Sequence, residues 1–332
     1  MDDAARTPDR GKYLFVRVLE ACNADCFMCG FALSRDKYRT QPDEFRDILR
    51  QGMEAGVGYV RFTGGEPLMH RDILDLVGIA KETDTRSSLI TNGFSLPLMA
   101  KSLAEAGLDQ VIVSIDSGEA ALHDEYRNTP KLFEKAFLGI LASRKYGIQV
   151  RVNTVIGPHN YESMPLLREL ITEAGVTQWE LSALKLSSQI TYDTPGEALA
   201  VGRLVYEGPG VVPMGKKWFG DTDEEQRRYF EDGTPPRASG PVCHVADDVM
   251  YLDPKAGYLF PCSLLPHRST PSLYGGDVSR GEGVVHLAAP KFEDRRRFFR
   301  ENGPKLCTGC SSSAAGYSDD RAAGLIAEPW AY

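Results

Sequence analysis

The chain has 332 residues, of which 42% are hydrophobic and 25% charged, and its formal net charge is −8. This length accommodates one large domain, or one domain with a small appendage. The acidic balance argues against a general nucleic-acid-binding protein, so we expect no nucleic-acid partner. No run is apolar enough to span a bilayer, and the polar start lacks the core of a signal peptide. We therefore expect a cytoplasmic protein without a membrane partner.

Three cysteines, Cys22, Cys26 and Cys29, follow the apolar run 13–19 in a C-x3-C-x2-C pattern. Soft thiolates at this spacing indicate an iron–sulfur or zinc site. Three thiolates can hold three irons of a [4Fe–4S] cube, and no fourth cysteine lies nearby, so one iron would be open to a small ligand. Three structural cysteines or a partial zinc site are the alternative.

Six apolar strands alternate with helical segments along the first half of the chain. We expect strands at 13–19, 59–62, 88–90, 111–113, 150–155 and 178–184, and helices at 41–55, 72–82, 96–106, 132–146, 161–174 and, farther on, 223–231. Such alternation predicts a parallel sheet with right-handed crossovers. In barrels of this kind the chemistry lies at the carboxyl ends of the strands. The polar motifs fall at those ends: the cysteine loop, 64–67, 91–93, 114–116, Asn153 and Ser182.

Two of these motifs have a direct physical interpretation. In Gly64-Gly65-Glu66-Pro67 the glycines let the backbone approach a ligand closely, and Glu66 adds an anion near a ligand amine. An ordinary turn with Pro67 starting a helix is the alternative. Arg127 closes the segment 123–127 and offers a planar donor fork to a carboxylate. A surface helix with ion pairs is the alternative there, and His123 is interpreted as structural.

A second cysteine group consists of Cys243, Cys262, Cys307 and Cys310. The runs 249–252 and 258–260 predict a hairpin, which brings Cys243 and Cys262 together. A helix expected over 291–300 then leads to the other two cysteines. Four thiolates can close one site, and zinc is the structural alternative to an iron–sulfur cluster.

The cysteine loop followed by Gly-Gly-Glu-Pro resembles the radical S-adenosylmethionine (SAM) enzymes over residues 12–185. The resemblance implies a partial (β/α)6 TIM-like barrel in which a [4Fe–4S] cluster binds SAM, cleaves it reductively and starts hydrogen-atom abstraction. The family usually has an aromatic residue before the third cysteine, where this chain has Met28. The second group resembles the auxiliary-cluster extension called twitch or SPASM. That likeness implies a small C-terminal α+β domain with one auxiliary [4Fe–4S] cluster.

The resemblance also assigns residues and boundaries. The SAM contacts it implies are Met28, Gly64, Gly65, Glu66, Ser114, Asp116, Arg127 and Asn153. The boundaries it suggests are a tail at 1–12, the barrel at 13–185, a connecting substrate-side segment at 186–240, the auxiliary-cluster domain at 241–311 and a tail at 312–332. A flavodoxin or ferredoxin is the expected electron donor.

The segments 13–35 and 176–186 resemble the cytosylglucuronate decarboxylases of blasticidin-type nucleoside antibiotic biosynthesis. This likeness implies decarboxylation of a glucuronyl nucleoside such as cytosylglucuronic acid. A carboxylate-bearing substrate needs a cationic partner, and Lys185, Arg151 and Lys216 are the candidates. An auxiliary cluster suits removal of a second electron, so a dehydrogenase of an aminocyclitol or sugar is one alternative. An epimerase is another, but it needs a hydrogen donor, and all seven cysteines are already assigned.

A ribosomal-peptide modifier is a further alternative. Such enzymes often carry an N-terminal leader-binding domain, and a first strand near residue 13 leaves no room for one, which favours a small-molecule substrate. A zinc-stabilised binding protein is the non-enzymatic alternative, and it would be colourless.

Overall fold

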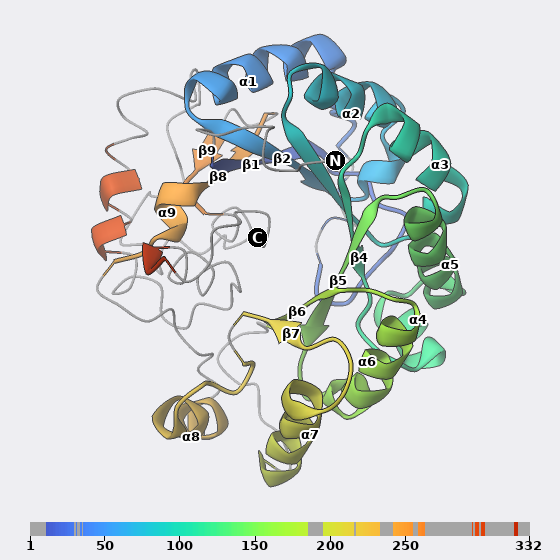
Figure 1. The fold of residues 1–332 in the computed structure, drawn as a ribbon, viewed down its shortest axis with the longest axis vertical. Helices are drawn as coiled ribbons and strands as arrows, with labels where there is room; N and C mark the ends of the chain where they lie inside the picture. Colours follow the sequence, from blue (N-terminus) through green and yellow to red (C-terminus); the bar gives the residue numbers. More distant parts are fainter. Residues whose placement is uncertain are drawn as a thin grey trace.

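The computed structural model describes residues 11–29, 31, 34, 36–184, 195–215, 217–232, 242–254, 258–262, 294, 296–298, 300–302 and 322–324. It confirms the predicted α/β fold, in which a parallel sheet is covered by helices (Figure 1). The strands are β1 (Lys12–Leu19), β2 (Val57–Gly64), β3 (Arg86–Thr91), β4 (Gln110–Ser114), β5 (Gln149–Ile156), β6 (Gln178–Ala183), β7 (Pro213–Met214), β8 (Val249–Asp253) and β9 (Tyr258–Phe260).

Helices follow the strands along the chain, and those from the first half of the chain cover the outer face of the sheet. They are α1 (Pro42–Glu54), η3 (Pro67–Met69), α2 (Ile73–Glu82), α3 (Leu96–Ala106), α4 (Ala120–Tyr126), α5 (Leu132–Lys145), η4 (Tyr161–Ser163), α6 (Met164–Glu173), α7 (Pro195–Glu207), α8 (Asp223–Asp232) and α9 (Val245–Asp248). The six predicted strands and the six predicted helices up to α8 are confirmed, with ends shifted by at most three residues. Residues 294, 296–298 and 300–302 are helical, in agreement with the helix predicted over 291–300, whose other residues lie outside the described ranges.

The sheet runs in the order β7-β6-β5-β4-β3-β2-β1-β8-β9. Every pairing from β7 to β8 is parallel, and only β8 and β9 are antiparallel. Parallel neighbours that follow each other along the chain place all their carboxyl ends at one edge of the sheet. The polar motifs after β1 to β6 therefore share one edge.

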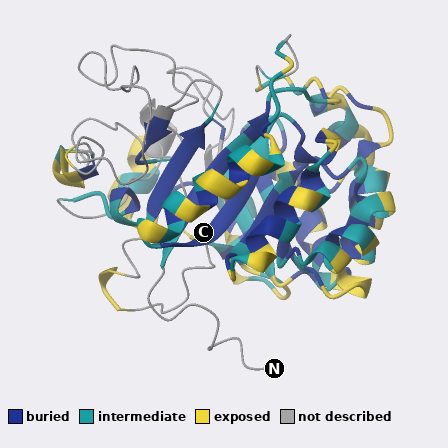
Figure 2. Cartoon of the chain, turned by 90° about the horizontal axis from the view of Figure 1, so that it is seen from above, coloured by how far each residue is buried: buried dark blue, intermediate teal, exposed yellow. Residues whose placement is uncertain are grey.

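Side chains that alternate along each strand separate the two faces of the sheet. On β1, Leu14, Val16 and Val18 are fully buried among the residues of the apolar core beneath the helices. The intervening side chains face the barrel interior, where Arg61 of β2 lies over the rings of Tyr13 and Phe15. Figure 2 shows the result, with buried strands inside and helices whose exposed residues lie on the outside.

The C-terminal hairpin extends this same sheet. The predicted pairing of 249–252 with 258–260 is confirmed, with Tyr251 opposite Phe260. In addition, β8 pairs in parallel with β1, from Tyr13 with Val249 to Val16 with Leu252. Sequence patterns do not predict this pairing, because it joins strands that are more than 200 residues apart and has no local signal. The predicted barrel (13–185) and the predicted auxiliary-cluster domain (241–311) therefore share one sheet, because β1 of the first is hydrogen-bonded to β8 of the second.

Other elements also lacked a signal in the sequence. Helix α7 falls in the segment 186–240, which we interpreted as a connection rich in Gly, Pro and charge, and β7 is only two residues long.

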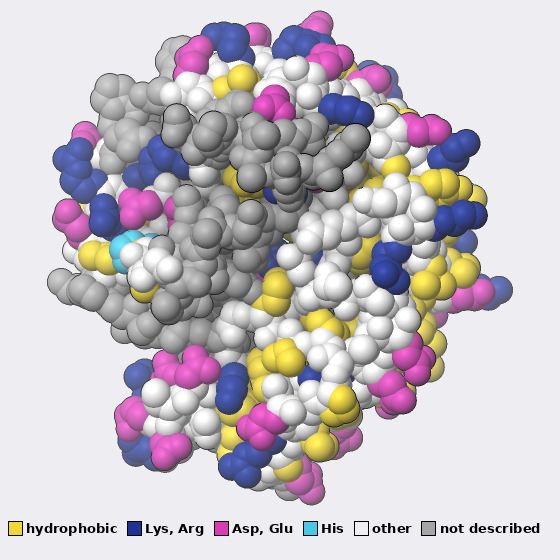
Figure 3. All heavy atoms as spheres, in the orientation of Figure 1, with side chains coloured by type: hydrophobic (Ala, Val, Ile, Leu, Met, Phe, Trp, Pro, Cys, Tyr) yellow, Lys and Arg dark blue, Asp and Glu magenta, His cyan; other side chains and the backbone are white. Residues whose placement is uncertain are grey.

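On the face shown in Figure 3, acidic and basic side chains are interspersed along the rim. Among the described residues, no helix combines the length and apolar content that crossing a bilayer requires.

Candidate metal centre at the strand ends

The cysteine loop, defined here as residues 20–29, leaves β1 at the carboxyl edge of the sheet. Cys22 and Cys26 are partly buried, and Cys29 is exposed. The Cys22 sulfur accepts a hydrogen bond from the Ala24 amide at 3.4 Å, and the Cys29 amide donates to the Cys26 carbonyl at 3.0 Å. Burial raises the pKa of the Cys26 thiol to about 11 and also raises that of Cys22.

Both glycines of Gly64-Gly65-Glu66 are required by close contact with the end of β1 and the start of this loop. A Cβ on Gly64 would lie 2.1 Å from the Leu19 carbonyl oxygen, and one on Gly65 would lie 2.2 Å from that of Ala21. Gly64 also has a φ of 145°, which L side chains rarely adopt. The amide of Gly65 donates to Leu19 at 3.0 Å. The backbone approach that we predicted toward a ligand is thus seen toward the cysteine loop.

Glu66 is buried and joins the ends of β2 and β3. Its carboxylate accepts hydrogen bonds from the Leu68 amide at 2.9 Å, the Thr91 hydroxyl at 2.7 Å and the Asn92 amide at 2.7 Å. Its own amide donates to the Ala21 carbonyl at 2.9 Å. Burial raises the pKa of Glu66, and these hydrogen bonds counter the shift. Four lone-pair positions on a carboxylate leave capacity for one further donor, such as a ligand amine.

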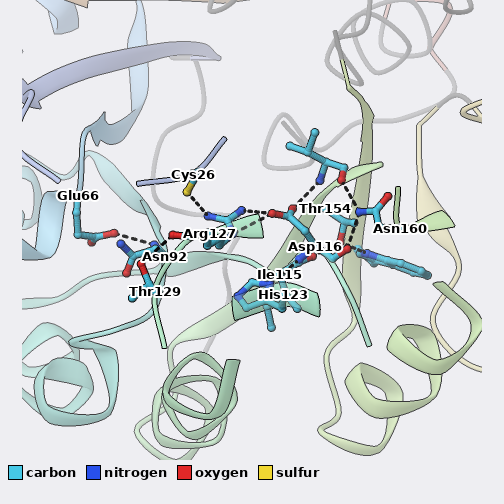
Figure 4. A network of polar contacts seen from close by, with 12 residues as sticks. Cys26, Glu66, Asn92, Ile115, Asp116, His123, Arg127, Thr129, Thr154 and Asn160 are labelled. Carbon is cyan, nitrogen blue, oxygen red and sulfur yellow. Dashed lines mark hydrogen bonds and ion pairs between the residues drawn. The ribbon is translucent and has the colours of Figure 1, made fainter. Parts of the chain in front are cut away.

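Arg127 follows α4 and lies between Asp116 and the cysteine loop (Figure 4). Its Nε and Nη2 lie 2.9 Å and 2.8 Å from Oδ2 of Asp116, and its Nη1 lies 4.0 Å from the Cys26 sulfur. Arg127 and Asp116 are both buried, so the alternative of a solvated surface helix does not hold at this position. The guanidinium counters the effect of burial on the Cys26 pKa. A cation is thus fixed beside a candidate ligand sulfur.

Asp116 is held from several sides. Its Oδ1 accepts from the Val155 amide at 3.0 Å, its carbonyl accepts from the Asn160 side chain at 2.6 Å, and its amide donates to Nδ1 of His123 at 3.1 Å. Burial first, and the charge of Arg127 second, lower the pKa of His123 to about 4. His123 is therefore neutral at pH 7. The Asp116 carboxylate thus already binds protein donors. Its predicted contact with a ribose stays a prediction.

Ser114 and Asn153 face each other across β4 and β5, where they are register partners at the carboxyl edge. The Asn153 side-chain oxygen is buried and has no hydrogen-bond partner among the described residues. A buried acceptor without a partner costs free energy, so a donor from a bound molecule would be stabilising there. A hydroxyl group has the matching chemistry. This observation fits the predicted SAM contact of Asn153.

The adenine contact predicted at Met28 has a defined setting. Met28 is partly buried and packs against the apolar core. Its neighbour Phe27 donates an amide hydrogen bond to the Tyr126 carbonyl at 3.2 Å, and its ring lies 5.2 Å from that of His159 in an edge-on arrangement. The half-exposed aromatic ring therefore belongs to Phe27, one place before the family's usual position.

Arg151 is the only one of the three predicted substrate cations that lies within the described ranges, since Lys185 and Lys216 fall outside them. Arg151 is fully buried, two residues before Asn153 on β5, and its Nε lies 3.6 Å from Glu180. This places it deeper in the barrel than the Ser114–Asn153 layer. Its charge contributes to lowering the pKa of buried Arg61 to about 10, an effect that is due first to burial.

Sequence reasoning missed two polar contacts near the loop. Arg17 of β1 lies 2.8 Å from Asp253 of β8 and 3.2 Å from Glu20, and its Nε donates to the Tyr251 hydroxyl at 3.3 Å. The second contact joins Asn92 to Asn23 at 2.8 Å. The motif Thr91-Asn92-Gly93, which follows a predicted strand, could have indicated the second contact. The first depends on the β1–β8 pairing, which has no such signal.

The second cysteine group is only partly described. Cys243 and Cys262 are partly buried, whereas Cys307 and Cys310 lie outside the described residues. The amide of Cys243 donates to the Arg300 carbonyl at 2.6 Å, so the segment before α9 contacts the helical turn around residue 300. The shared site of the four cysteines stays a prediction.

Within the described ranges, no three Cys, His, Asp or Glu side chains gather closely enough to hold one metal ion. A polynuclear cluster distributes its thiolates over several metal atoms. The half-buried cysteines, the neighbouring guanidinium and the unpartnered Asn153 oxygen fit a cluster with a bound polar molecule. Cys22, Cys26 and Cys29 would hold the cluster.

Comparison with known proteins finds a matching family model and several similar proteins. Residues 16–171 match the radical SAM superfamily. The AdoMet-dependent heme synthase of Nitratidesulfovibrio vulgaris is 28% identical over 176 residues, which are 52% of this chain and 48% of that protein. A probable GTP 3′,8-cyclase of Sulfurisphaera tokodaii is 30% identical over 174 residues, which are 52% of this chain and 55% of that protein. The chain thus spans about half the length of these curated relatives.

Two solved structures share the fold. Streptococcus suis SuiB bound to S-adenosylmethionine has a TM-score of 0.60 at 17% identity, with 79% of this chain and 62% of that chain covered. The enzyme anSMEcpe with bound AdoMet and the Kp18Cys peptide has a TM-score of 0.61 at 15% identity, with 87% and 82% covered. The sequence match over residues 16–171, the shared fold and the cysteine loop at the carboxyl edge of the sheet agree: just under half of this chain is similar to the radical SAM superfamily.

Proposed function

We propose that this protein is a radical SAM enzyme that abstracts a hydrogen atom from a sugar-like or nucleoside precursor. The observation that carries the proposal is the three-cysteine loop held at the carboxyl edge of a parallel sheet, next to buried acceptors and one guanidinium. Radical SAM proteins use a [4Fe–4S] cluster with SAM. When bound, the cluster and SAM supply an electron and a radical that removes a hydrogen atom from the substrate.

The side chains of this chain would divide the work of binding SAM. Glu66 retains acceptor capacity for the amine, and Arg127 presents its remaining N–H groups to the carboxylate. The Asn153 side-chain oxygen accepts a hydrogen bond from a ribose hydroxyl. Asp116 acts through Arg127, because it fixes the guanidinium at two nitrogens. The barrel interior would keep water away from the radical.

For the substrate, we propose a glucuronyl nucleoside such as cytosylglucuronic acid. It would lose a hydrogen atom to the radical and its carboxylate as carbon dioxide, and would then take up two protons and one electron from the reductant to give the decarboxylated product. The support is the resemblance of segments 13–35 and 176–186 to cytosylglucuronate decarboxylases. Lys185 follows directly after Leu184, whose amide donates to the Ile156 carbonyl at the end of β5 at 2.7 Å. This sequence position makes Lys185 the preferred cationic partner over Arg151, which lies deeper.

The alternative is an aminocyclitol or sugar dehydrogenase. Removal of a second electron would use an auxiliary [4Fe–4S] cluster held by Cys243, Cys262, Cys307 and Cys310, which we also propose. The pairing of β8 with β1 favours this candidate, because it connects the strand that leads into the cysteine loop with the strand that follows Cys243. Modification of a peptide is a further alternative.

The decisive experiment is an anaerobic reaction of the iron-reconstituted chain with SAM and a flavodoxin or chemical reductant, with and without the glucuronyl nucleoside. Formation of 5′-deoxyadenosine and carbon dioxide is followed together. The proposal expects the nucleoside to stimulate both in matching amounts. A Cys29→Ser variant is the control, because it lacks one cluster ligand and should form neither product.

Other outcomes separate the parts of the proposal. Slow 5′-deoxyadenosine formation that the nucleoside does not change would reject this substrate and lead to aminocyclitols and then peptides. A carbonyl product without carbon dioxide would favour the dehydrogenase. A colourless chain that binds zinc instead of iron and sulfide would reject the radical SAM activity itself.

A further inference from the structure

The motif Thr91-Asn92-Gly93 at the end of β3 has no role in the proposed chemistry, yet its central side chain contacts the cysteine loop. We propose that Asn92 is a positioning residue that fixes the cysteine loop at Asn23 and thereby sets the orientation of Cys22. The inference deepens the proposed function and rests on it in one respect, namely that Cys22 is a cluster ligand.

The amide orientation of Asn92 follows from its surroundings. Its Oδ1 accepts a hydrogen bond from the Phe94 amide at 2.9 Å, and a backbone N–H can only donate. The Nδ2 group must therefore point the other way, where it donates to Oδ1 of Asn23 at 2.8 Å. With its own amide bound to Glu66 at 2.7 Å, Asn92 is held at three points. It is 6% exposed, so few alternative partners are available from water.

The turn that carries Asn92 is fixed by hydrogen bonds and by close packing. Thr91 donates its hydroxyl to Glu66 at 2.7 Å and accepts from the Gly93 amide at 3.0 Å. Gly93 has a φ of 86°, and a Cβ there would lie 2.8 Å from the Cα of Ala136 on α5. The turn therefore packs closely against α5 on one side and is hydrogen-bonded to Glu66 on the other. Figure 4 shows the Glu66 carboxylate facing Asn92.

Cys22 is the cysteine that this arrangement controls. The residue before it is bound through the Ala21 carbonyl to the Glu66 amide at 2.9 Å, and the residue after it is bound to Asn92. Cys26 is contacted instead by Arg127, and Cys29 is exposed. Loss of the Asn92 contact should therefore loosen Cys22 and leave Cys26 unchanged. Such selectivity separates a positioning role from a general effect on stability.

The test measures the alkylation rate of each cysteine in the reduced, metal-free full chain, with iodoacetamide as the probe and peptide mass spectrometry as the readout. Asn92→Ala and Asn23→Ala should each accelerate labelling of Cys22, because one hydrogen bond of ordinary strength changes a local opening equilibrium roughly two- to tenfold. Asn23→Asp keeps the acceptor and should behave like the wild type. Ser95→Ala, in the same turn but without a side-chain cap hydrogen bond, is the matched control.

A second readout is the rate at which a ferrous chelator removes iron from the reconstituted chain, which should rise in the two alanine variants. The Asn23→Ala/Asn92→Ala double variant should be no faster than either single variant, since both remove the same bond. Equal Cys22 labelling in wild type and alanine variants would overturn the inference, as would equal acceleration of all three cysteines. If Asn92→Ala does not fold, Asn23→Ala, at an exposed residue, decides. A wild-type chain that binds no iron would reject the proposed function, while the labelling comparison still tests the contact.

Discussion

Arg127 and Asp116 form the buried ion pair nearest to the cysteine loop, and each depends on the other. Asp116 is fully buried, and Arg127 binds it through two nitrogens. Removing one member of such a pair leaves an uncompensated charge and typically costs about 3–5 kcal/mol. We therefore expect Arg127→Ala to lower the free energy of unfolding of the metal-free chain by roughly that amount. Urea denaturation followed by circular dichroism measures it.

The double variant Asp116→Asn/Arg127→Gln is the control for this prediction. It removes both charges, keeps polar groups of similar size, and should lose less stability than Arg127→Ala alone. A double variant that is as unstable as the sum of the single variants would show that the two residues act independently, contrary to the geometry.

His123 gives the fold a pH dependence. Its pKa falls from an ordinary value of 6.5 to about 4 because it is buried. Between these values the unfolded chain binds the proton more tightly than the folded chain, so stability rises with pH. The contribution is fully present above about pH 6.5 and is lost as pH falls toward 4, by up to about 3 kcal/mol.

His123→Asn isolates this contribution, because asparagine keeps an acceptor for the Asp116 amide but does not titrate. Unfolding free energies of the metal-free chain at pH 7, 6 and 5 should fall less steeply in the variant than in the wild type. Parallel curves for the two proteins would mean that His123 titrates normally in the folded state.

At the scale of elements, the sequence predicts β1 to β6 and the C-terminal hairpin, but not how the two join. Local signals were sufficient for β8 and β9: two apolar runs of strand length across Asp253-Pro254. No local pattern identifies β1 as the parallel partner of β8. Likewise, α7 begins in a segment whose Gly, Pro and charged residues resemble a loop, and tertiary packing determines its structure.

The Arg17–Asp253 ion pair should hold the hairpin against β1. Its side chains are 12% and 10% exposed at a distance of 2.8 Å, and hydrogen bonds between such charged groups contribute about 1.5–3 kcal/mol. We expect Asp253→Ala to lower stability by that order and to raise hydrogen exchange at Val249 to Leu252, while β3 to β5 keep their protection.

The control is Arg46→Ala, which removes an ion pair with Glu82 whose side chains are 53% and 63% exposed. Exposed pairs are worth at most about 1 kcal/mol, so exchange in the hairpin should not change. If both variants had the same effect on exchange, Asp253 would have no special role at this junction.

For the whole molecule, the site was predictable where the chain uses residue types with special chemistry. Three cysteines, two glycines and the polar residues at the strand ends indicated where a site would form. Their contacts were not predictable: Glu66 binds three protein donors, and the Asp116 carboxylate binds Val155 of β5 and Arg127 after α4. These contacts depend on distances between strand ends, which only the assembled sheet determines. The positions of Lys185 and Lys216 relative to the site stay predictions, because both residues lie outside the described ranges.

The β1–β8 pairing also makes a prediction for the whole chain. A chain that ends at residue 240 lacks β8 and leaves the backbone of β1 from Tyr13 to Val16 without its partner strand. Unpaired strand edges promote association between molecules. We expect this truncated chain to self-associate in size-exclusion chromatography with light scattering, under conditions where the full chain keeps a single size. A monomeric truncated chain with unchanged melting temperature would show that the barrel does not need the hairpin.

The two outermost strands of the sheet are its shortest. Among the described residues, β7 has two residues, one of them a proline, and β9 has three. A sheet that does not close on itself must end somewhere, and long unpaired ends act as templates for aggregation. Here the longest strands lie inside the sheet, and little backbone is left at either margin to recruit a neighbouring molecule. The sheet can therefore end at two short strands without closing on itself and still resist fibre-like assembly.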